Sequence, residues 1–345
     1  MVGINKLTAI VAAAWAMSQA VAADDARGLL ERMERSLATR NYQGTFVHEH
    51  DGQSETLKIV HRVVGNEVAE RIASMDGSGR EIVRRNGELR AYFPDRRLVL
   101  VESGPKEGLL LNDLRRLDNA ASQMYRLHEE AATRISGRAA RVIAVEPQDD
   151  MRYGYRVWID ESSAMPLKTQ LRTLAGRVVE QLVFTELTLP AHIAETMLQA
   201  RVMARDYRWL RHDTAALASQ PAIDSAAGTT WDAVRLPPGF RLTANSMQIL
   251  AGASAAVTHL VFSDGVASVS VFVEPQRAAD LDSPSLPAAA TLTNLGPSSA
   301  LSVEVNGHWV TAIGEVPPAT VRAIASSMRA GFAPAVNPGL MSRRR

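Results

Sequence analysis

The chain has 345 residues, 46% hydrophobic and 22% charged, which is typical of a globular protein of about two domains. This balance excludes a disordered, collagen-like or polytopic membrane protein. The net charge is only +1 and aromatic residues make up 5%, so neither a basic field nor base stacking favours binding of nucleic acid. The absence of cysteine excludes disulfides, thiolate nucleophiles, Cys-ligated zinc and iron–sulfur clusters.

Residues 1–23 have the pattern of a secretory signal peptide. Lys6 precedes the apolar stretch Leu7–Met17, which is too short to span a bilayer as a helix. Ala20-Val21-Ala22 then offers small residues at a cleavage site. A buried N-terminal helix is the alternative interpretation. There is no cysteine at the cleavage site to carry a lipid anchor, so we expect an exported, unanchored and soluble protein.

The segment 24–40 is predicted to be a helix, because Leu29, Leu30, Met33 and Leu37 recur on one helical face. Short strands separated by Asp-Gly and Asn-Gly pairs follow. Such pairs supply the positive φ angles of tight hairpins, so the pattern predicts an antiparallel meander. Its strands are expected at Gln43–His50, Ser54–Val64, Glu67–Met75, Arg80–Arg85, Glu88–Phe93 and Arg97–Glu102.

A second helix is predicted over Asn112–Glu130, where apolar residues again recur at helical spacing. Four more strands are expected at Ala139–Glu146, Tyr153–Asp160, Leu167–Thr173 and Arg177–Leu187. Pro190 suits the entry to a short helix over Ala191–Ala200. Since a sheet must bury one face, residues 24–205 are predicted to form a curved antiparallel half-barrel covered by helices, an α+β unit.

Residues 206–229 are interpreted as a linker, since most of them are small, polar and unpatterned. Residues 230–333 are predicted to form a smaller antiparallel α+β domain that ends in a helix over Ala319–Met328. Its strands are expected at Phe240–Thr243, Met247–Leu250, Val257–Ser263, Val266–Glu274, Leu301–Val305 and His308–Gly314. The segment Arg277–Ser299 is expected to be a loop, and residues 334–345 a disordered tail.

The sequence has no nucleophile elbow, zinc-protease motif, P-loop or dinucleotide-binding glycine pattern. His48 and His50 would share one face of a strand, with His61 able to approach from the next strand, but zinc needs three or four convergent ligands. The paired carboxylates Asp149-Asp150 and Asp160-Glu161 stand in turn-like contexts. We therefore expect no enzyme activity, no catalytic residues, no metal and no cofactor.

A curved sheet with an apolar inner face under helices suggests a cavity for an apolar ligand. The candidates to line it are Tyr42, Phe46, Tyr92, Phe93, Leu98, Leu100 and Leu109. Residues of these types also fill ordinary cores, so plain core packing stays open as the alternative.

Several segments of the chain are similar to the RseB/MucB family. In the first unit these are Asn41–His50, Leu57–Arg62, Asn86-Gly87, Tyr92–Asp95, Tyr155–Asp160 and Met165–Lys168. The stretch from Tyr155 to Lys168 is also similar to the LolA and LolB lipoprotein carriers. In the second unit the resemblance rests on Leu236–Phe240, Leu260–Gly265, Val269–Pro275 and Gly314–Val321.

The resemblance implies a periplasmic regulator of the sigma-E-type envelope stress response. Such a protein binds the periplasmic region of a membrane anti-sigma factor of the RseA or MucA type and shields it from site-1 proteolysis. Lipopolysaccharide or lipoprotein acyl chains act as the signal that releases it. By this resemblance the first unit is a LolA-like lipid sensor. We expect the second unit, together with the linker, to bind the anti-sigma factor. Homo-oligomer formation stays open.

Two other functions are compatible with an exported two-unit protein. A lipid or lipoprotein carrier of the LolA class needs only the first unit, so the second unit argues against it. An exported hydrolase needs a nucleophile with a base, or a metal site, and the sequence offers neither.

Arginine forks fit phosphate, so arginines near the predicted cavity are candidates for binding lipid phosphates at its rim. These are Arg84, Arg85, Arg96 and Arg97. A solvated charge cluster at the strand ends is the alternative. Aromatic and arginine side chains are favoured interface anchors, so the candidate contacts to the anti-sigma factor are Trp231, Arg235, Phe240 and Trp309. For Phe240 and Trp309, ordinary core packing is the alternative.

Overall fold

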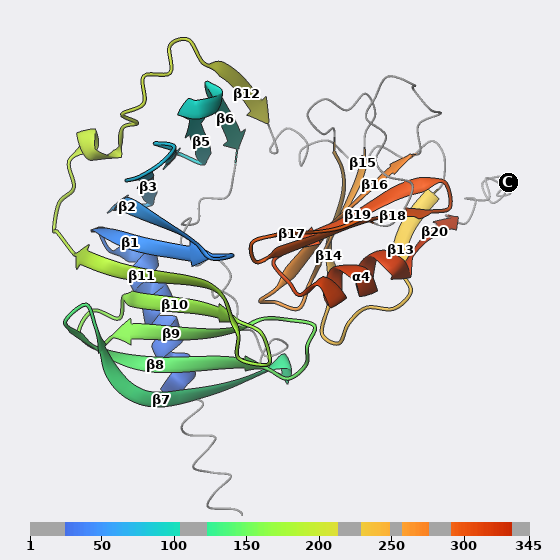
Figure 1. The fold of residues 1–345 in the computed structure, drawn as a ribbon, viewed down its shortest axis with the longest axis horizontal. Coiled ribbons are helices and arrows are strands. Elements are labelled where there is room, and N and C mark those ends of the chain that lie inside the picture. Colours follow the sequence, from blue (N-terminus) through green and yellow to red (C-terminus); the bar gives the residue numbers. More distant parts are fainter. Residues whose placement is uncertain (1–24, 104–122, 213–228, 249–256, 276–290, 333–345) are drawn as a thin grey trace, which may run out of the picture. The chain divides into compact units, whose positions relative to one another are not determined.

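The computed structural model describes residues 25–103, 123–212, 229–248, 257–275 and 291–332. The chain divides into two compact units, the first built mainly from residues up to 215 and the second from most of the rest (Figure 1). The predicted signal peptide, Leu109 and the predicted tail 334–345 lie outside the described residues. Within the described ranges, none of the helices has both the length and the hydropathy needed to cross a membrane.

The first unit is an open sheet of twelve strands with a helix over residues 25–39. Neighbouring strands are antiparallel, except that β12 runs parallel to β6. From one edge to the other the order is β12 (Arg208–His212), β6 (Leu98–Ser103), β5 (Glu88–Phe93), β4 (Glu81–Arg85), β3 (Glu67–Ser74), β2 (Gln53–Val64), β1 (Tyr42–His50), β11 (Val178–Thr188), β10 (Pro166–Arg172), β9 (Gly154–Asp160), β8 (Arg138–Pro147) and β7 (Tyr125–Ile135).

The hairpins of this sheet close as their turn residues predicted. Asp51-Gly52 joins β1 to β2 with φ angles of 49° and 72°. Asn86-Gly87 joins β4 to β5 with φ angles of 52° and 74°. Two successive positive φ angles give the turn twist that matches the strands on either side. The antiparallel meander and the predicted strands of this unit are therefore confirmed, with ends shifted by a residue or two.

Three expectations for the first unit are wrong. The helix predicted over Asn112–Glu130 is wrong from Tyr125 onward, where β7 pairs with β8; residues 123–124 are helical, and residues 112–122 lie outside the described residues. The helix expected over Ala191–Ala200 is only the 3₁₀ turn η3 (Glu195–Leu198). The predicted linker 206–229 begins with β12, which takes its hydrogen bonds from β6. Sheet pairing thus overrides the local helical spacing.

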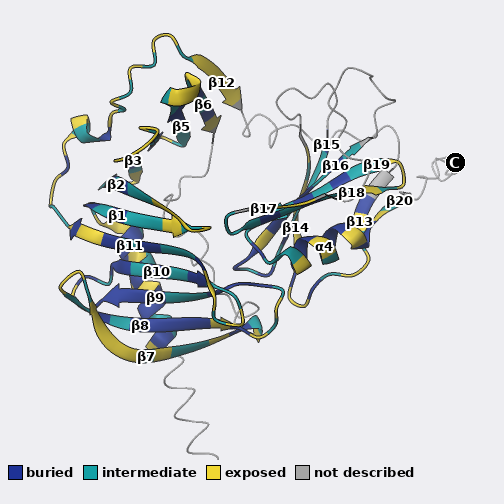
Figure 2. Cartoon of the chain, in the orientation of Figure 1, coloured by how far each residue is buried: buried dark blue, intermediate teal, exposed yellow. Residues whose placement is uncertain are grey.

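The helix over residues 25–39 covers one face of the sheet, which we call the inner face (Figure 1). Leu29, Leu30, Met33 and Leu37 are buried, as their spacing predicted. They form one core with residues of β1, β2 and β7–β11. Figure 2 shows β8 to β10 as largely buried, whereas much of β7, at the edge of the sheet, is exposed. The described part of this unit therefore has one long helix on its sheet, where several were expected.

The second unit is a six-stranded antiparallel sheet with one helix and a two-stranded ribbon. The sheet order is β14 (Arg241–Gln248), β15 (Val257–Ser263), β16 (Ser268–Pro275), β19 (His308–Gly314), β18 (Ser298–Val305) and β17 (Thr291–Leu295). Helix α4 (Pro318–Ser327) packs on β18 and β19 with Val321 and Ile324 fully buried. The ribbon pairs β13 (Thr229–Ala233) with β20 (Met328–Phe332).

The predicted α+β class of the second unit is confirmed, and its details need two corrections. The strands expected at Phe240–Thr243 and Met247–Leu250 are one strand, β14, whose pairing with β15 absorbs a register shift between Leu242 and Ala244. Strand β17 lies within the segment predicted as a loop, where pairing with β18 outweighs a composition rich in Ala, Ser and Pro. The ribbon strands β13 and β20 were not predicted.

Candidate functional site

Strand register decides which of the predicted lipid-lining residues share a face. Directly opposed residues form rows across β1 to β6, and one row runs Gly44, Ile59, Ile72, Ile82, Ala91 and Leu100. Because side chains alternate along a strand, Tyr42, Phe46, Phe93, Leu98 and Leu100 all belong to this inner face. Tyr92 lies on the opposite, outer face. The register therefore brings together all but one of the described candidates.

The inner face has a filled part and an open part. Tyr42 and Phe46 are buried in the core under the helix, and Phe46 packs against Phe184 with ring centroids 5.6 Å apart. Ile72 on β3 still packs against this core. Farther out, on β5 and β6, Phe93, Leu98 and Leu100 are only half-buried. The apolar surface that an acyl chain could use is therefore the part of the inner face on β4 to β6.

A buried ionic cluster lies beside this apolar row, on β2 to β4. It joins three side chains of the row next to Tyr42: His61, Glu70 and Arg84. The Glu70 carboxylate is fully buried and accepts hydrogen bonds from Arg84 Nη2 at 3.0 Å, with His61 Nδ1 at 2.8 Å from its other oxygen. The Tyr42 ring stacks on His61 with centroids 4.4 Å apart. Burial of a charge is stable only with such partners.

The arginines expected at a cavity rim occupy different places. Arg84 is 4% exposed and bound to Glu70, so it does not lie at a rim. Arg85 is exposed on the outer face and forms an ion pair with Glu195. Arg96 and Arg97 are exposed at the turn η1 (Pro94–Arg96) between β5 and β6, next to the half-buried inner-face residues.

The outer face of β2 to β6 is covered by the segment that follows β11. Ile193 and Leu198 pack on Val60 and Ala69. Tyr92 belongs to a second cluster with Val99 and Val101, under residues 200–207. A second buried ion pair, Arg71 with Glu81 at 3.0 Å, lies on this face, and Glu81 also accepts the backbone N–H of Arg201. Tyr92 is therefore part of the apolar core on the outer face and does not line the inner-face surface.

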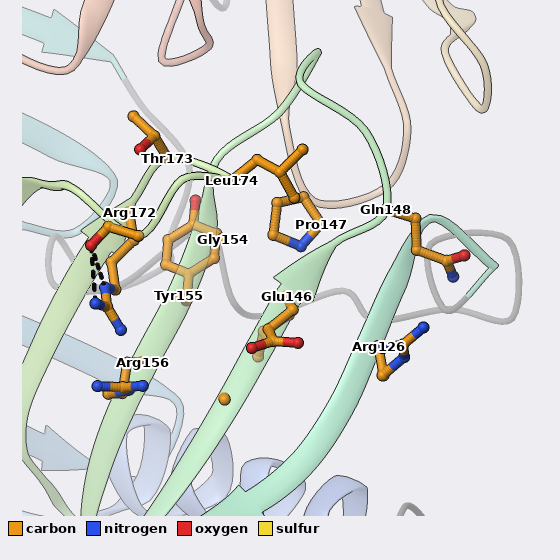
Figure 3. A pocket seen from close by; sticks show the side chains of 13 residues that line it. Arg126, Glu146, Pro147, Gln148, Gly154, Tyr155, Arg156, Arg172, Thr173 and Leu174 are labelled. Atoms are coloured by element: carbon orange, nitrogen blue, oxygen red, sulfur yellow. Dashed lines mark hydrogen bonds between the residues drawn. The ribbon is translucent and has the colours of Figure 1, made fainter.

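The first unit has several pockets, two of which lie away from the helix over residues 25–39. One, of about 370 Å³, lies at the ends of β7 to β10 (Figure 3). Its polar wall includes Arg126, Glu146, Arg156 and Arg172, with Tyr155 and Leu174 beside them. Much of its charge is already paired, since Arg156 donates to Glu130 and Arg172 donates from Nε and Nη2 to the Gly176 carbonyl.

The other pocket, of about 770 Å³, lies on the outer face between β4, β5, β12 and the segment 198–205. Tyr92, Val83 and Trp209 contribute apolar walls, and Arg85, Arg90 and Arg205 stand around it. Glu88 also lines this pocket; a hydrogen bond from Arg90 lowers its pKa, and Arg211 adds to the effect. Neither pocket was predictable from the sequence, because each is assembled from segments that are distant along the chain.

The histidines considered for a metal do not converge. His48 forms an ion pair with Glu180 on β11, and its ring lies 5.0 Å from that of His50. His61 lies opposite Tyr42 in the register of β1 and β2, and Tyr42 is six residues from His48 along β1. The His61 side chain is buried against Glu70. Over the described ranges, no three His, Asp or Glu side chains are grouped so that they could hold a metal ion.

The predicted contact residues of the second unit differ in exposure. Trp231 on β13 is buried, with its ring 5.1 Å from that of His308, and Phe240 is buried as well. Trp309 is half-buried, on the face of the sheet opposite to Val310. Arg235 is exposed. Arg235 and Trp309 are therefore the two of the four that a partner can reach directly.

Both units match known domain families. The MucB/RseB N-terminal domain matches residues 25–202, and the MucB/RseB C-terminal domain matches residues 225–329. The chain belongs to the MucB/RseB family. This confirms the resemblance drawn from the sequence. Both family domains are present in their usual order, so the match includes the second unit as well as the sheet of the first.

Curated family members are similar over nearly their full length. The chain is 31% identical over 319 residues to the sigma factor AlgU regulatory protein MucB of Pseudomonas aeruginosa, covering 90% of this chain and 92% of that protein. It is 27% identical to the sigma-E factor regulatory protein RseB of Escherichia coli K12, covering 88% and 91% respectively.

Solved structures of MucB have the same fold. The Pseudomonas aeruginosa MucA/MucB complex matches with a TM-score of 0.67 and 30% identity, over 90% of this chain and all of that chain. A crystal structure of MucB in complex with MucA(peri) matches with a TM-score of 0.66 and 30% identity, over 89% of this chain and all of that chain.

Proposed function

We propose that this chain is a periplasmic regulator that binds the periplasmic region of a membrane anti-sigma factor of the RseA or MucA type. By holding that region it shields the anti-sigma factor from site-1 proteolysis and so restrains a sigma-E-type factor. The observation that carries the proposal is the match of both units to the two MucB/RseB domains. The names of its relatives as sigma factor regulators, and the complexes of MucB with MucA, support it.

The partner surface is assigned to the second unit, at Arg235 and Trp309. Arg235 is exposed, and Trp309 is half-buried on the sheet face that lies opposite the residues packed against α4. Trp231 and Phe240 are buried and so are not part of the exposed surface. Arginine and tryptophan are common anchors of interfaces because they combine large contact areas with directed hydrogen bonds.

The lipid signal is assigned to the open part of the inner face. Phe93, Leu98 and Leu100 offer a half-buried apolar surface, and Arg96 and Arg97 stand exposed at the adjacent turn. An acyl chain on this surface would leave its phosphate or headgroup near guanidinium groups, which suits charge-assisted hydrogen bonds. If lipid binds the free regulator better than the complex, it releases the anti-sigma factor, and the coupling is reciprocal.

A lipid carrier of the LolA class is the second candidate function, and the same half-buried inner face is the observation that favours it. It predicts lipid binding without an affinity for the anti-sigma factor. The regulator predicts both, with one weakening the other. Neither candidate function includes an enzyme activity, and both are compatible with a homo-oligomer.

The proposal is tested by biolayer interferometry of residues 24–345 against the periplasmic region of the host's anti-sigma factor, with and without lipopolysaccharide. Tight binding that lipopolysaccharide weakens supports the regulator and its signal. Binding that is indifferent to lipid keeps the regulator and removes the lipid signal. No binding overturns the regulator in favour of the carrier.

A charge-reversal pair locates the surface. Arg235→Glu is expected to weaken binding by about tenfold or more, the loss expected for an anchor residue. The matched control is Arg322→Glu, at an exposed position of α4. Equal losses from both variants would point to general electrostatics and away from a surface at Arg235.

A further inference from the structure

We propose that the outer edge of β12, with the 770 Å³ pocket beside it, binds an extended acidic peptide that adds a strand to the sheet of the first unit. This site lies on the first unit and does not depend on the regulator's surface at Arg235 and Trp309. It is carried by three observations: an unpaired strand edge, apolar side chains exposed on both of its faces, and the charge around them.

The edge is formed by the last strand of the sheet. β12 pairs with β6 from Arg208 to His212, and in the described residues no strand pairs with its other side. Figure 1 shows β12 at the end of the sheet, beyond β6 and β5. An edge strand presents unpaired N–H and C=O groups, which a peptide in extended conformation can satisfy.

Neighbouring side chains of β12 are exposed on opposite faces. Trp209 is 47% exposed, lines the pocket, and meets Tyr92 edge-on with ring centroids 6.3 Å apart. Leu210 is 39% exposed and points to the inner face, because its partner in the register is Leu100. An added strand would place alternate side chains beside these two residues. Those peptide side chains that point to the outer face would lie beside the pocket, which offers space to bury an apolar side chain.

The charges favour an acidic occupant. Several arginines of this region are already paired, Arg85 with Glu195 and both Arg90 and Arg211 with Glu88. Arg205 and Arg208 are exposed and have no ion pair within the described chain. Three exposed carboxylates oppose them, Asp95, Asp206 and Glu102, the last opposite His212 in the register. Arg96 and Arg97 add exposed positive charge at the turn beside Arg208, so the unpaired positive charge still exceeds the negative. The remaining positive charge would repel a basic peptide and attract an acidic one.

The probe is a blocked peptide of about six residues that alternates glutamate and valine, matched to a typical strand length. Its binding to residues 24–345 is measured by fluorescence anisotropy. One control peptide has lysine in place of glutamate. A second control has every other amide N-methylated, which keeps the charge and side chains but prevents strand pairing. We expect at least tenfold weaker binding of both controls.

The variant that tests the pocket is Trp209→Glu, with Met203→Glu as its control. Met203 is 86% exposed in the same segment and does not line the pocket. We expect Trp209→Glu to weaken binding at least tenfold and Met203→Glu to change it less than twofold. Equal effects of the two variants would overturn the proposal.

Hydrogen exchange on the unmodified protein gives a second reading that does not depend on how the variants fold. Bound peptide should slow exchange of amides in β12 and leave β7, the opposite edge of the sheet, unchanged. No binding, equal binding of the N-methylated peptide, or protection spread over both edges would overturn the proposal. Preference for the lysine peptide, or binding of anionic vesicles in place of any peptide, would also do so.

Discussion

The two halves of the twelve-stranded sheet are stabilised in different ways. Under the helix over residues 25–39, strands β1 and β7–β11 contribute side chains to one continuous apolar core. Across β2 to β4, both faces carry buried ion pairs, Glu70 with Arg84 on the inner face and Arg71 with Glu81 on the outer face. The one long helix of the described residues is too narrow to cover twelve strands, and among these residues the half outside its reach keeps an apolar surface partly open.

The two halves should also differ in how they respond to mutation. Burying a large apolar side chain contributes about 1.5–3 kcal/mol, and truncating it leaves a cavity. A buried ion pair contributes little net stability, yet removing one partner leaves a desolvated charge behind. In the half with ion pairs, the loss of a single charged group should therefore lower the free energy of unfolding more than the loss of a single apolar side chain does in the other half. This is expected although the half with ion pairs buries fewer apolar residues.

The largest effect is expected for Glu70→Ala. It leaves Arg84 and His61 buried without their carboxylate, which should cost about 3–5 kcal/mol of the free energy of unfolding. The measurement is urea unfolding followed by circular dichroism. Glu102→Ala is the control. Glu102 lies on the inner face in the same row of opposed residues as Glu70 and Arg84, but it is exposed at the end of that row. Similar losses for both variants would remove the distinction between the halves.

The next effect is expected for Met33→Ala, which empties space in the fully packed half. Met33 is 2% exposed in the helix-covered core, so the loss should be about 2–5 kcal/mol. Leu100→Ala on the open part of the inner face removes a half-buried side chain and should cost about 1 kcal/mol or less. Comparable losses would mean that the inner face of β6 is packed as tightly as the core.

Part of this contrast could be predicted from the sequence. The Gly65-Asn66 turn is a two-residue hairpin, so it alone fixes His61 opposite Glu70. Alternation along β5 by itself places Tyr92 and Phe93 on opposite faces. The pairing of Glu70 with Arg84 could not be predicted, because the longer connection between Ser74 and Glu81 leaves the register open.

The remaining misses have other physical causes. The last part of the helix predicted over Asn112–Glu130, from Tyr125 onward, failed because apolar spacing of three to four residues cannot outweigh a long ladder between β7 and β8. Strand β12 was missed because a parallel partner, β6, is supplied by residues about a hundred positions earlier. The predicted position of Arg84 at a rim failed because an arginine in a strand gives no sign of its burial until its partner carboxylate is known.

Asp160→Asn tests an ion pair at the end of the helix-covered half. Asp160 accepts from Arg138 Nη2 at 2.9 Å and from Ser162 and Ser163. Burial raises its pKa, but these hydrogen bonds outweigh burial and hold the pKa well below its usual range. The variant should cost about 1.5–3 kcal/mol at neutral pH, the range for hydrogen bonds to a charged group.

The pH dependence follows from the direction of this shift. A carboxylate with a lowered pKa in the folded state stabilises it fully above its unfolded pKa of about 3.9, and this contribution is lost as the pH falls below that value. The difference between the native protein and Asp160→Asn should therefore shrink between about pH 5 and pH 2. A difference that stays constant over this range would show that Asp160 acts through packing and not through its charge.

The smallest effect on stability, and the most informative for function, is expected for Leu100→Lys. Leu100 is half-buried on the open part of the inner face, and its lysine replacement can extend its amine toward solvent, so unfolding should change by about 1 kcal/mol or less. A charge placed on the acyl-chain surface should weaken binding of a fluorescent fatty acid by about tenfold. Val64→Lys is the matched control, since Val64 is exposed at the end of β2. If both variants bind the fatty acid as the native protein does, the acyl chain does not lie on β6, and the open half of the sheet serves a purpose other than lipid sensing.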